Sequence, residues 1–266
     1  MDVYVKYVGA IEQPINAIVA NQRPFFMTKE EVGEMDEYRK QYGCDGECWE
    51  ANIMEQIKEN KYGWFDLSKS LIDIGAGAGE YPIFSGFSHS YAFEPNRKKQ
   101  CLIYANMLSF DRMNNIDVFP YAISDNPGVR GFNGWSEDLN NIGNSGTDKY
   151  LDKGIVQMEY RTLDSFNLDN IGLIKVDIEG YEYNALRSGI GTIIRNNYPP
   201  LLIEIWNDYN IQRWFDKHGM GEFFLEKKRK LLKLLDDLGY VRINDQFGDW
   251  ETFFFIHKDQ LNGYTN

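Results

Sequence analysis

The stretch Leu71-Ile-Asp-Ile-Gly-Ala-Gly-Ala-Gly79 decides the fold. Residues 71–74 form a short apolar run of the kind that builds a buried strand, and the glycines at alternate positions after it predict a sharp turn. Glycine has no Cβ, so such a turn lets a ligand approach the backbone closely. In a doubly wound sheet, ligands bind outside the carboxyl ends of the strands. The stretch therefore predicts a strand that ends in a ligand-binding turn.

From Ser70 onwards, short apolar runs alternate with helical patterns, which is typical of an α/β fold with a doubly wound, mostly parallel sheet. We expect seven strands, at residues 71–74, 90–93, 116–119, 172–177, 201–206, 240–243 and 252–256. Expected helices cover residues 96–113, the segment that ends near 195, and 222–238. A hairpin of the last two strands would add an antiparallel edge to the sheet.

Two regions fall outside this pattern. Residues 1–65 are predicted to form a mainly helical N-terminal extension, with helices near 28–38 and 47–60, before a domain at 66–266. This extension either covers a substrate cleft or pads the sheet. Residues 126–159 are rich in Gly, Asn, Ser and Asp, and a loop of this length is usually functional or mobile.

The charge pattern disfavours nucleic acid as a partner. The formal net charge is −12, from 28 basic and 40 acidic residues, and such a surface repels a polyanion. The one dense basic run, Lys227–Lys230, alternates with leucines at helical spacing, as on the solvated face of an amphipathic helix.

Cysteine use and hydropathy indicate a soluble protein. Cys44, Cys48 and Cys101 are too few for a disulfide scaffold, and no cysteine or histidine pair follows at zinc spacing. No stretch approaches the roughly 20 apolar residues of a membrane span, and the N-terminus lacks the pattern of a signal peptide. We expect a cytoplasmic protein; its oligomeric state is left open.

Two carboxylates frame the glycine-rich turn. Glu94 ends the second expected strand, 21 residues after Asp73, where a carboxylate can accept hydrogen bonds from both ribose hydroxyls. Asp73 either faces the positive end of a ligand or anchors the turn. The spacing is Gly-x-Gly-x-Gly, whereas a nicotinamide-dependent oxidoreductase would show Gly-x-Gly-x-x-Gly, a seat for a pyrophosphate. That class fits the strand order but not the glycine spacing of the turn, and a tight turn without a ligand also stays open.

Several sequence blocks together resemble the FkbM-type S-adenosylmethionine-dependent methyltransferases. The blocks are Asp73–Gly79, Ala92–Asn96, Ala122–Asp125, Thr162–Asp164, Ile174–Glu182, Leu186–Gly189 and Pro200–Glu204. They follow the family's order and spacing over about residues 70–206. The resemblance implies a Rossmann-like class I methyltransferase fold, S-adenosylmethionine as the cofactor, and methyl transfer to a hydroxyl, commonly on a sugar or a polyketide.

The resemblance also implies which residues bind the cofactor. The matching positions are Asp73, Gly75, Ala76, Gly77, Glu80, Tyr81, Glu94, Pro95, Ala122, Ile123 and Asp177. We expect Glu94 to bind the ribose, and Ala122 and Ile123 to contact the adenine. Glu80 and Tyr81 are expected to touch the methionine part.

A row of charged residues ends the fourth expected strand. Lys175, Asp177 and Glu179 are spaced by two, so they would share one face if the strand continued that far. Buried charges are costly unless they are paired or used, and Glu204 on the next strand is the expected partner. A purely structural salt-bridge network is one interpretation of this row.

The other interpretation is catalytic. A hydroxyl must lose its proton as it attacks a methyl group, and a carboxylate, or a metal such as Mg²⁺ held by carboxylates, can ease that loss. Asp177 is the first candidate base, followed by Glu204 and Glu179, and Asp177 with Glu204 would hold a metal. Lys175 would keep Asp177 ionised or lower the pKa of the acceptor hydroxyl.

The leading hypothesis is therefore an O-methyltransferase whose acceptor is a sugar, a glycan or a glycosylated small molecule. Trp206, Tyr209 and Trp214 follow the fifth strand among Asn and Asp residues, a mixture that suits a sugar, although a hydrophobic clamp would look similar. The alternatives are a methyltransferase for the 2′-hydroxyl of RNA ribose, an oxidoreductase, and a cofactor-binding module without catalysis.

Overall fold

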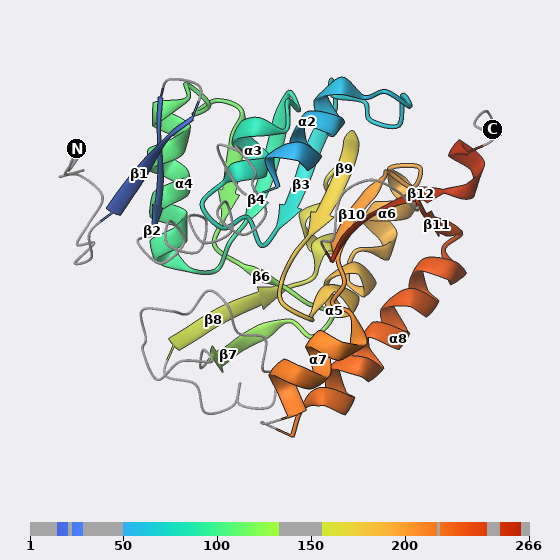
Figure 1. Ribbon diagram of the computed structural model, residues 1–266. Helices are drawn as coiled ribbons and strands as arrows, with labels where there is room; N and C mark the ends of the chain where they lie inside the picture. The colour runs from blue at the N-terminus through green and yellow to red at the C-terminus, as the bar shows by residue number, and fades with distance from the viewer. Residues whose placement is uncertain are drawn as a thin grey trace.

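The centre of the fold is a seven-stranded sheet. The computed structural model describes residues 15–20, 23–28, 50–132, 156–216, 219–243 and 251–261. The strands of this sheet are β3 (Ser70–Ile74), β4 (His89–Phe93), β5 (Ile116–Phe119), β9 (Ile171–Val176), β10 (Leu201–Glu204), β11 (Tyr240–Arg242) and β12 (Thr252–His257). Their order is β11-β12-β10-β9-β3-β4-β5 (Figure 1).

This sheet confirms the predicted doubly wound, mostly parallel architecture. Only β12 runs antiparallel to its neighbours within this sheet, and every other pair is parallel. The expected hairpin of β11 and β12 forms, but β12 inserts between β10 and β11. The chain moves outwards from β3 to β5 and returns to β9 beside β3, so the switch point lies between β3 and β9.

Helices cover both faces of the sheet. They are α2 (Ala51–Glu59), α3 (Glu80–Phe84), α4 (Arg97–Ser109), α5 (Glu182–Arg187), α6 (Ile190–Arg195), α7 (Asp208–Phe215) and α8 (Gly221–Asp237), with 3₁₀ turns at Leu163–Phe166 and Lys258–Gln260. The single helix expected to end near 195 is in fact two, because the Ser188 hydroxyl bonds Ala185 O and accepts the Leu163 N–H. Within the described part of the chain, no helix has both the length and the apolarity to cross a membrane.

Side-chain alternation along the central strands separates the two largest hydrophobic clusters of the described structure. Leu71, Leu173 and Leu202 pack in one cluster with residues of α2, α3 and α4. Their neighbours Ile72 and Ile174 pack in the other with residues of α5, α6 and α8. Because alternate residues share a face, the charged residues two positions after Leu71 and Leu173 lie on the face covered by α2, α3 and α4.

The N-terminal segment contains a β-hairpin that was not predicted. Strands β1 (Ile15–Ala20) and β2 (Arg23–Thr28) pair antiparallel and run beside α4 (Figure 1). Phe25 and Met27 are fully buried in the cluster around Leu71. Of the expected helices here, α2 is confirmed, and most of the other lies beyond the described residues. The boundary near residue 65 stays a prediction.

A second, smaller sheet stands where an irregular loop was expected. Strands β6 (Ala122–Ile123), β7 (Gly128–Phe132) and β8 (Val156–Arg161) form it in the order β6-β8-β7. Both ends of the 126–159 segment are thus strands, and residues 133–155 lie outside the described part. Figure 1 places this sheet below the central one, at the end where β3 and β9 terminate.

Asn106 should be a large contributor to stability. Its buried amide accepts the Phe26 N–H at 2.6 Å and donates to Phe26 O at 2.9 Å and to Ala78 O at 2.8 Å. Asn106→Ala leaves these buried backbone groups unsatisfied, so urea denaturation should show a loss of about 2–4 kcal/mol in unfolding free energy. Leu108→Ala on the same helix, at a side chain 61% exposed, should change it by less than about 0.5 kcal/mol. Equal effects would contradict this assignment.

Candidate functional site

The glycine-rich turn after β3 forms an open cradle. The N–H groups of Gly75 and Ala76 donate to Phe93 O at 3.0 and 3.2 Å, which ties the turn to β4. Gly75 has a φ of 88°, and a Cβ there would lie 1.9 Å from the backbone oxygen of Asp177, so only glycine fits. At Gly77, by contrast, a Cβ would meet only Glu80 Oε2 within 4 Å, at 3.7 Å. The turn is therefore packed at Gly75 and open at Gly77.

Glu94 supports this turn from the end of β4. Its side chain is buried, with 6% of the residue exposed. Oε2 accepts the Gly77 N–H at 3.0 Å and Oε1 accepts the Asn96 N–H at 2.8 Å. A carboxylate accepts up to about four hydrogen bonds, so these two N–H groups do not exhaust it. Glu94 thus lies directly against the cradle, and its contact with a ribose stays a prediction.

A buried ion pair network joins β3 to β9. Lys175 lies opposite Asp73 in the strand register, and its Nζ is 3.7 Å from Asp73 Oδ1 and 3.1 Å from Asp177 Oδ2. Burial raises the pKa of Asp73 to about 6, with Lys175 acting against this rise. Burial alone would lower the pKa of Lys175, but Asp177 and Asp73 raise it above its ordinary value, so the ammonium stays charged. This geometry favours the anchoring role of Asp73.

Asp177 is the exposed member of the network. Its side chain keeps 34% of its surface accessible, against 1% for Asp73 and 5% for Lys175. The Asp177 N–H donates to Ile74 O at 3.0 Å, which fixes the residue just beyond the end of β9. Asp177 therefore keeps a partly accessible carboxylate beside the turn, next to Gly75.

Tyr81 and Glu50 extend the network beyond Lys175. The Lys175 ammonium lies 4.8 Å from the centre of the Tyr81 ring, and the Tyr81 hydroxyl donates to Glu50 Oε2 at 2.7 Å. Glu50 directly precedes α2. The sequence reasoning missed Glu50, because it stands outside every motif block among other acidic residues. That Tyr81 and Glu80 touch the methionine part of a cofactor stays a prediction.

The expected pairing of Lys175 with Glu204 is wrong. The register places Lys175 opposite Leu202, two residues before Glu204, so the ammonium turns to Asp73 and Asp177 instead. Burial raises the pKa of Glu204 well above its ordinary value, and the carboxylates of Asp177 and Glu179 raise it further. Among the described groups, Glu204 Oε2 has no hydrogen-bond partner.

The turn after β9 is held by Glu182. Its Oε1 accepts the N–H groups of Ile178 and Gly180 at 3.1 and 3.0 Å, and burial raises its pKa to about 7. The strand ends at Val176, so Glu179 does not continue the row on its face but sits in this turn with a φ of 60°. Glu182 lies in the sequence block Ile174–Glu182, but the sequence alone did not indicate a role for this residue.

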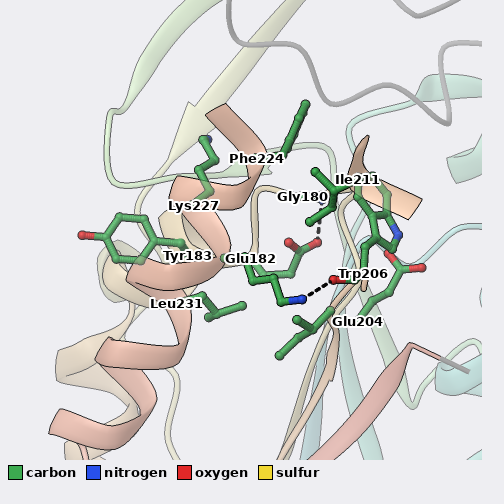
Figure 2. A pocket seen from close by; sticks show the side chains of 11 residues that line it. Gly180, Glu182, Tyr183, Glu204, Trp206, Ile211, Phe224, Lys227 and Leu231 are labelled. Carbon is green, nitrogen blue, oxygen red and sulfur yellow. Dashed lines mark hydrogen bonds between the residues drawn. The ribbon is translucent and has the colours of Figure 1, made fainter. Parts of the chain in front are cut away.

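A small cavity lies beneath this turn, between β10, α7 and α8 (Figure 2). Its volume is about 20 Å³, enough for one water molecule rather than a sugar. Trp206 lines it and stacks on Phe215 at 5.0 Å, with only 8% of the indole residue exposed. The hydrophobic-clamp interpretation is therefore correct for Trp206. Tyr209 is 68% exposed, and the side chains of Trp214 and His218 lie outside the described part.

For the remaining residues predicted to bind the cofactor, the structure gives only their burial. Ile123 is buried in the cluster with Phe93, and Ala122 is half-buried beside it, so their contact with adenine stays a prediction. Ala76 is buried and Pro95 half-buried next to the cradle. Within the described ranges, no group of three or more His, Cys, Asp or Glu side chains could hold a metal ion, so a metal site at Asp177 and Glu204 is not supported.

Comparison with known proteins identifies the family. Residues 73–259 match the model of the methyltransferase FkbM domain, and no curated protein matches the sequence. Similar solved structures include methyltransferase FkbM from Methylobacillus flagellatus KT, with 20% identity, a TM-score of 0.44, and coverage of 72% of this chain and 44% of that one. SAH-bound methyltransferase PaMTH1 from Podospora anserina has 9% identity, a TM-score of 0.46, and coverage of 87% and 88%.

A third similar structure is precorrin-6y C5,15-methyltransferase from Geobacter metallireducens GS-15, with 12% identity, a TM-score of 0.39, and coverage of 77% and 86%. This chain spans less than half the length of the Methylobacillus flagellatus protein. The sequence match to the family model, which covers more than two thirds of the chain, carries the assignment. The chain belongs to the FkbM family of methyltransferases.

Proposed function

We propose that the protein is an S-adenosylmethionine-dependent O-methyltransferase that acts on a hydroxyl of a sugar, a glycan or a glycosylated small molecule. The observation that carries this proposal is the turn that is open at Gly77, supported by Glu94 and placed beside the exposed carboxylate of Asp177. This arrangement supports a donor site and a proton acceptor at one edge of the sheet. Methyl transfer to a hydroxyl needs both.

The residues of the cradle fit this cofactor. Open space at Gly77 leaves room for a ligand against the backbone, and Glu94 offers its carboxylate to ribose hydroxyls. Asp73 holds the strand end through Lys175. When bound, the cofactor supplies an activated methyl group on a sulfonium. The protein's task is then to align the acceptor oxygen and to remove its proton.

Asp177 is the proposed proton acceptor. Its partly exposed carboxylate is available to a bound hydroxyl, and the Lys175 ammonium lies 3.1 Å from its Oδ2. Lys175 is too deeply buried to meet the acceptor itself. Glu204 and Glu179 are the next candidates, and the buried surroundings of Glu204 favour its neutral form. General base catalysis of this kind contributes roughly 10²- to 10⁴-fold in rate.

The exposed groups of α7 and α8 favour a carbohydrate acceptor over RNA. Tyr209 exposes an aromatic face at the start of α7, next to Asn207 and Asp208. The ammonium groups of Lys227 and Lys228 are engaged within the protein, with Asn184 Oδ1 at 2.6 Å and Asp208 Oδ1 at 2.6 Å. Membership of a methyltransferase family leaves the oxidoreductase hypothesis without support.

Loss of the Glu94 carboxylate should weaken cofactor binding. In Glu94→Ala, the dissociation constant for S-adenosylmethionine, measured by calorimetry, should rise at least about tenfold, because charged hydrogen bonds are lost on both the turn and the ribose. The matched control is Glu226→Ala, which removes an exposed carboxylate on α8 that pairs with Lys230. An unchanged affinity in Glu94→Ala would contradict the binding site, and no binding by the wild type would contradict the function.

Asp177→Asn should separate binding from turnover. The variant keeps the shape of the side chain, so cofactor affinity should stay within a few-fold, while methyl transfer should fall roughly 10²- to 10⁴-fold. Formation of S-adenosylhomocysteine would be followed with a panel of mono- and oligosaccharides, with and without Mg²⁺. Asp169→Asn, an exposed carboxylate paired with Arg195, is the control. Full activity in Asp177→Asn would exclude it as the base.

A further inference from the structure

Glu50 brings a third carboxylate into the cluster around Lys175. The residue lies outside the part of the chain that matches the family, and its backbone has a φ of 50°, a left-handed conformation that is uncommon for a residue with a side chain. Its carboxylate accepts the Tyr81 hydroxyl at 2.7 Å. Lys175 and Asp177 both act on it electrostatically, and the Thr252 side chain hydrogen-bonds it. The half-buried Glu50 therefore belongs to the charged cluster around Lys175.

The cluster carries more negative than positive charge. Asp73, Asp177 and Glu50 surround one ammonium, that of Lys175, which gives a formal charge of −2 when all three carboxylates are ionised. Asp73 Oδ1 is buried and has no hydrogen-bond partner in the described structure. Burial raises the pKa of Glu50 and of Asp73, because neither charge is fully compensated. Such a cluster is stabilised by an additional cation.

The proposed reaction changes the charge of the cofactor by one unit. The methyl carbon forms a bond to the acceptor oxygen, its bond to sulfur breaks, and the electron pair of that bond stays on sulfur, while the acceptor proton goes to the base. The donor therefore has a cationic sulfonium, whereas the by-product S-adenosylhomocysteine has a neutral thioether. The two ligands are otherwise alike, so a nearby net charge can distinguish them.

We infer that Glu50 is a specificity-determining residue, whose charge makes the cofactor site prefer the sulfonium donor to the neutral by-product. This inference rests on the proposed function. Glu50 adds a negative charge to the single excess charge that Asp73 and Asp177 already have over Lys175, whose ammonium lies 3.7 and 3.1 Å from them. A site with this preference releases the by-product after each transfer and is less inhibited by it.

The test is a comparison of two dissociation constants. Calorimetry would measure binding of S-adenosylmethionine and of S-adenosylhomocysteine to the wild type and to Glu50→Gln, which keeps an acceptor for the Tyr81 hydroxyl but removes the charge. We expect the preference for S-adenosylmethionine to fall by roughly 3- to 10-fold, through weaker donor binding and unchanged by-product binding. Two controls are matched to it. Tyr81→Phe removes the hydrogen bond without changing charge, and Glu55→Gln removes an exposed carboxylate of α2; both should leave the ratio unchanged.

The possible outcomes separate the two proposals. If the wild type binds neither ligand, the proposed function fails and this inference fails with it. If the wild type binds both ligands and Glu50→Gln leaves the ratio of their dissociation constants unchanged, only the inference is overturned. The same holds if Glu50→Gln weakens the binding of both ligands equally. In either case the role of Glu50 is to anchor Tyr81. Thermal unfolding would establish that each variant is folded. Should Glu50→Gln not fold, Asp73→Asn removes a charge from the same cluster and must lower the ratio if the cluster's charge sets it.

Discussion

The site is organised around one buried ammonium. Lys175 lies within the sheet with 4% of its surface exposed, and a charge at such depth is tolerated only beside opposite charges. Asp73 at the end of β3 and Asp177 beyond the end of β9 meet this requirement. Because these strands flank the switch point, the same ion pairs that stabilise the strand ends also bring the glycine-rich turn next to the exposed carboxylate.

Most of the fold follows from local sequence signals. Each strand of the central sheet lies within a few residues of its expected bounds. Strands such as β9 are buried on both faces, so they appear in the sequence as short, nearly continuous apolar runs that are easy to recognise. Glu94 and the turn could be predicted together because their spacing depends only on one strand-turn-helix-strand unit. The spacing by two also correctly placed Lys175 and Asp177 in contact.

Other parts depend on tertiary pairing and could not be predicted. The partner of Lys175 was predicted wrongly because register between β9 and β10 decides whether Glu204 or Leu202 lies opposite, and no local pattern sets register. The β1–β2 hairpin was missed because Phe25 and Met27 are buried through contacts with α4, which is distant in the sequence. Glu50 reaches the site through the same long-range packing, and the burial of Trp206 against α7 and α8 likewise depends on helices far along the chain.

The contact at Gly75 has a consequence for how such an enzyme can diverge. A Cβ there would lie 1.9 Å from the backbone oxygen of Asp177, so the glycine-rich turn and the strand end that carries Asp177 are backbone against backbone. Neither can shift without displacing the other. Selection for a new acceptor therefore cannot remodel this seam and must work on the segments around it. The packed side of this seam leaves little room for substitution.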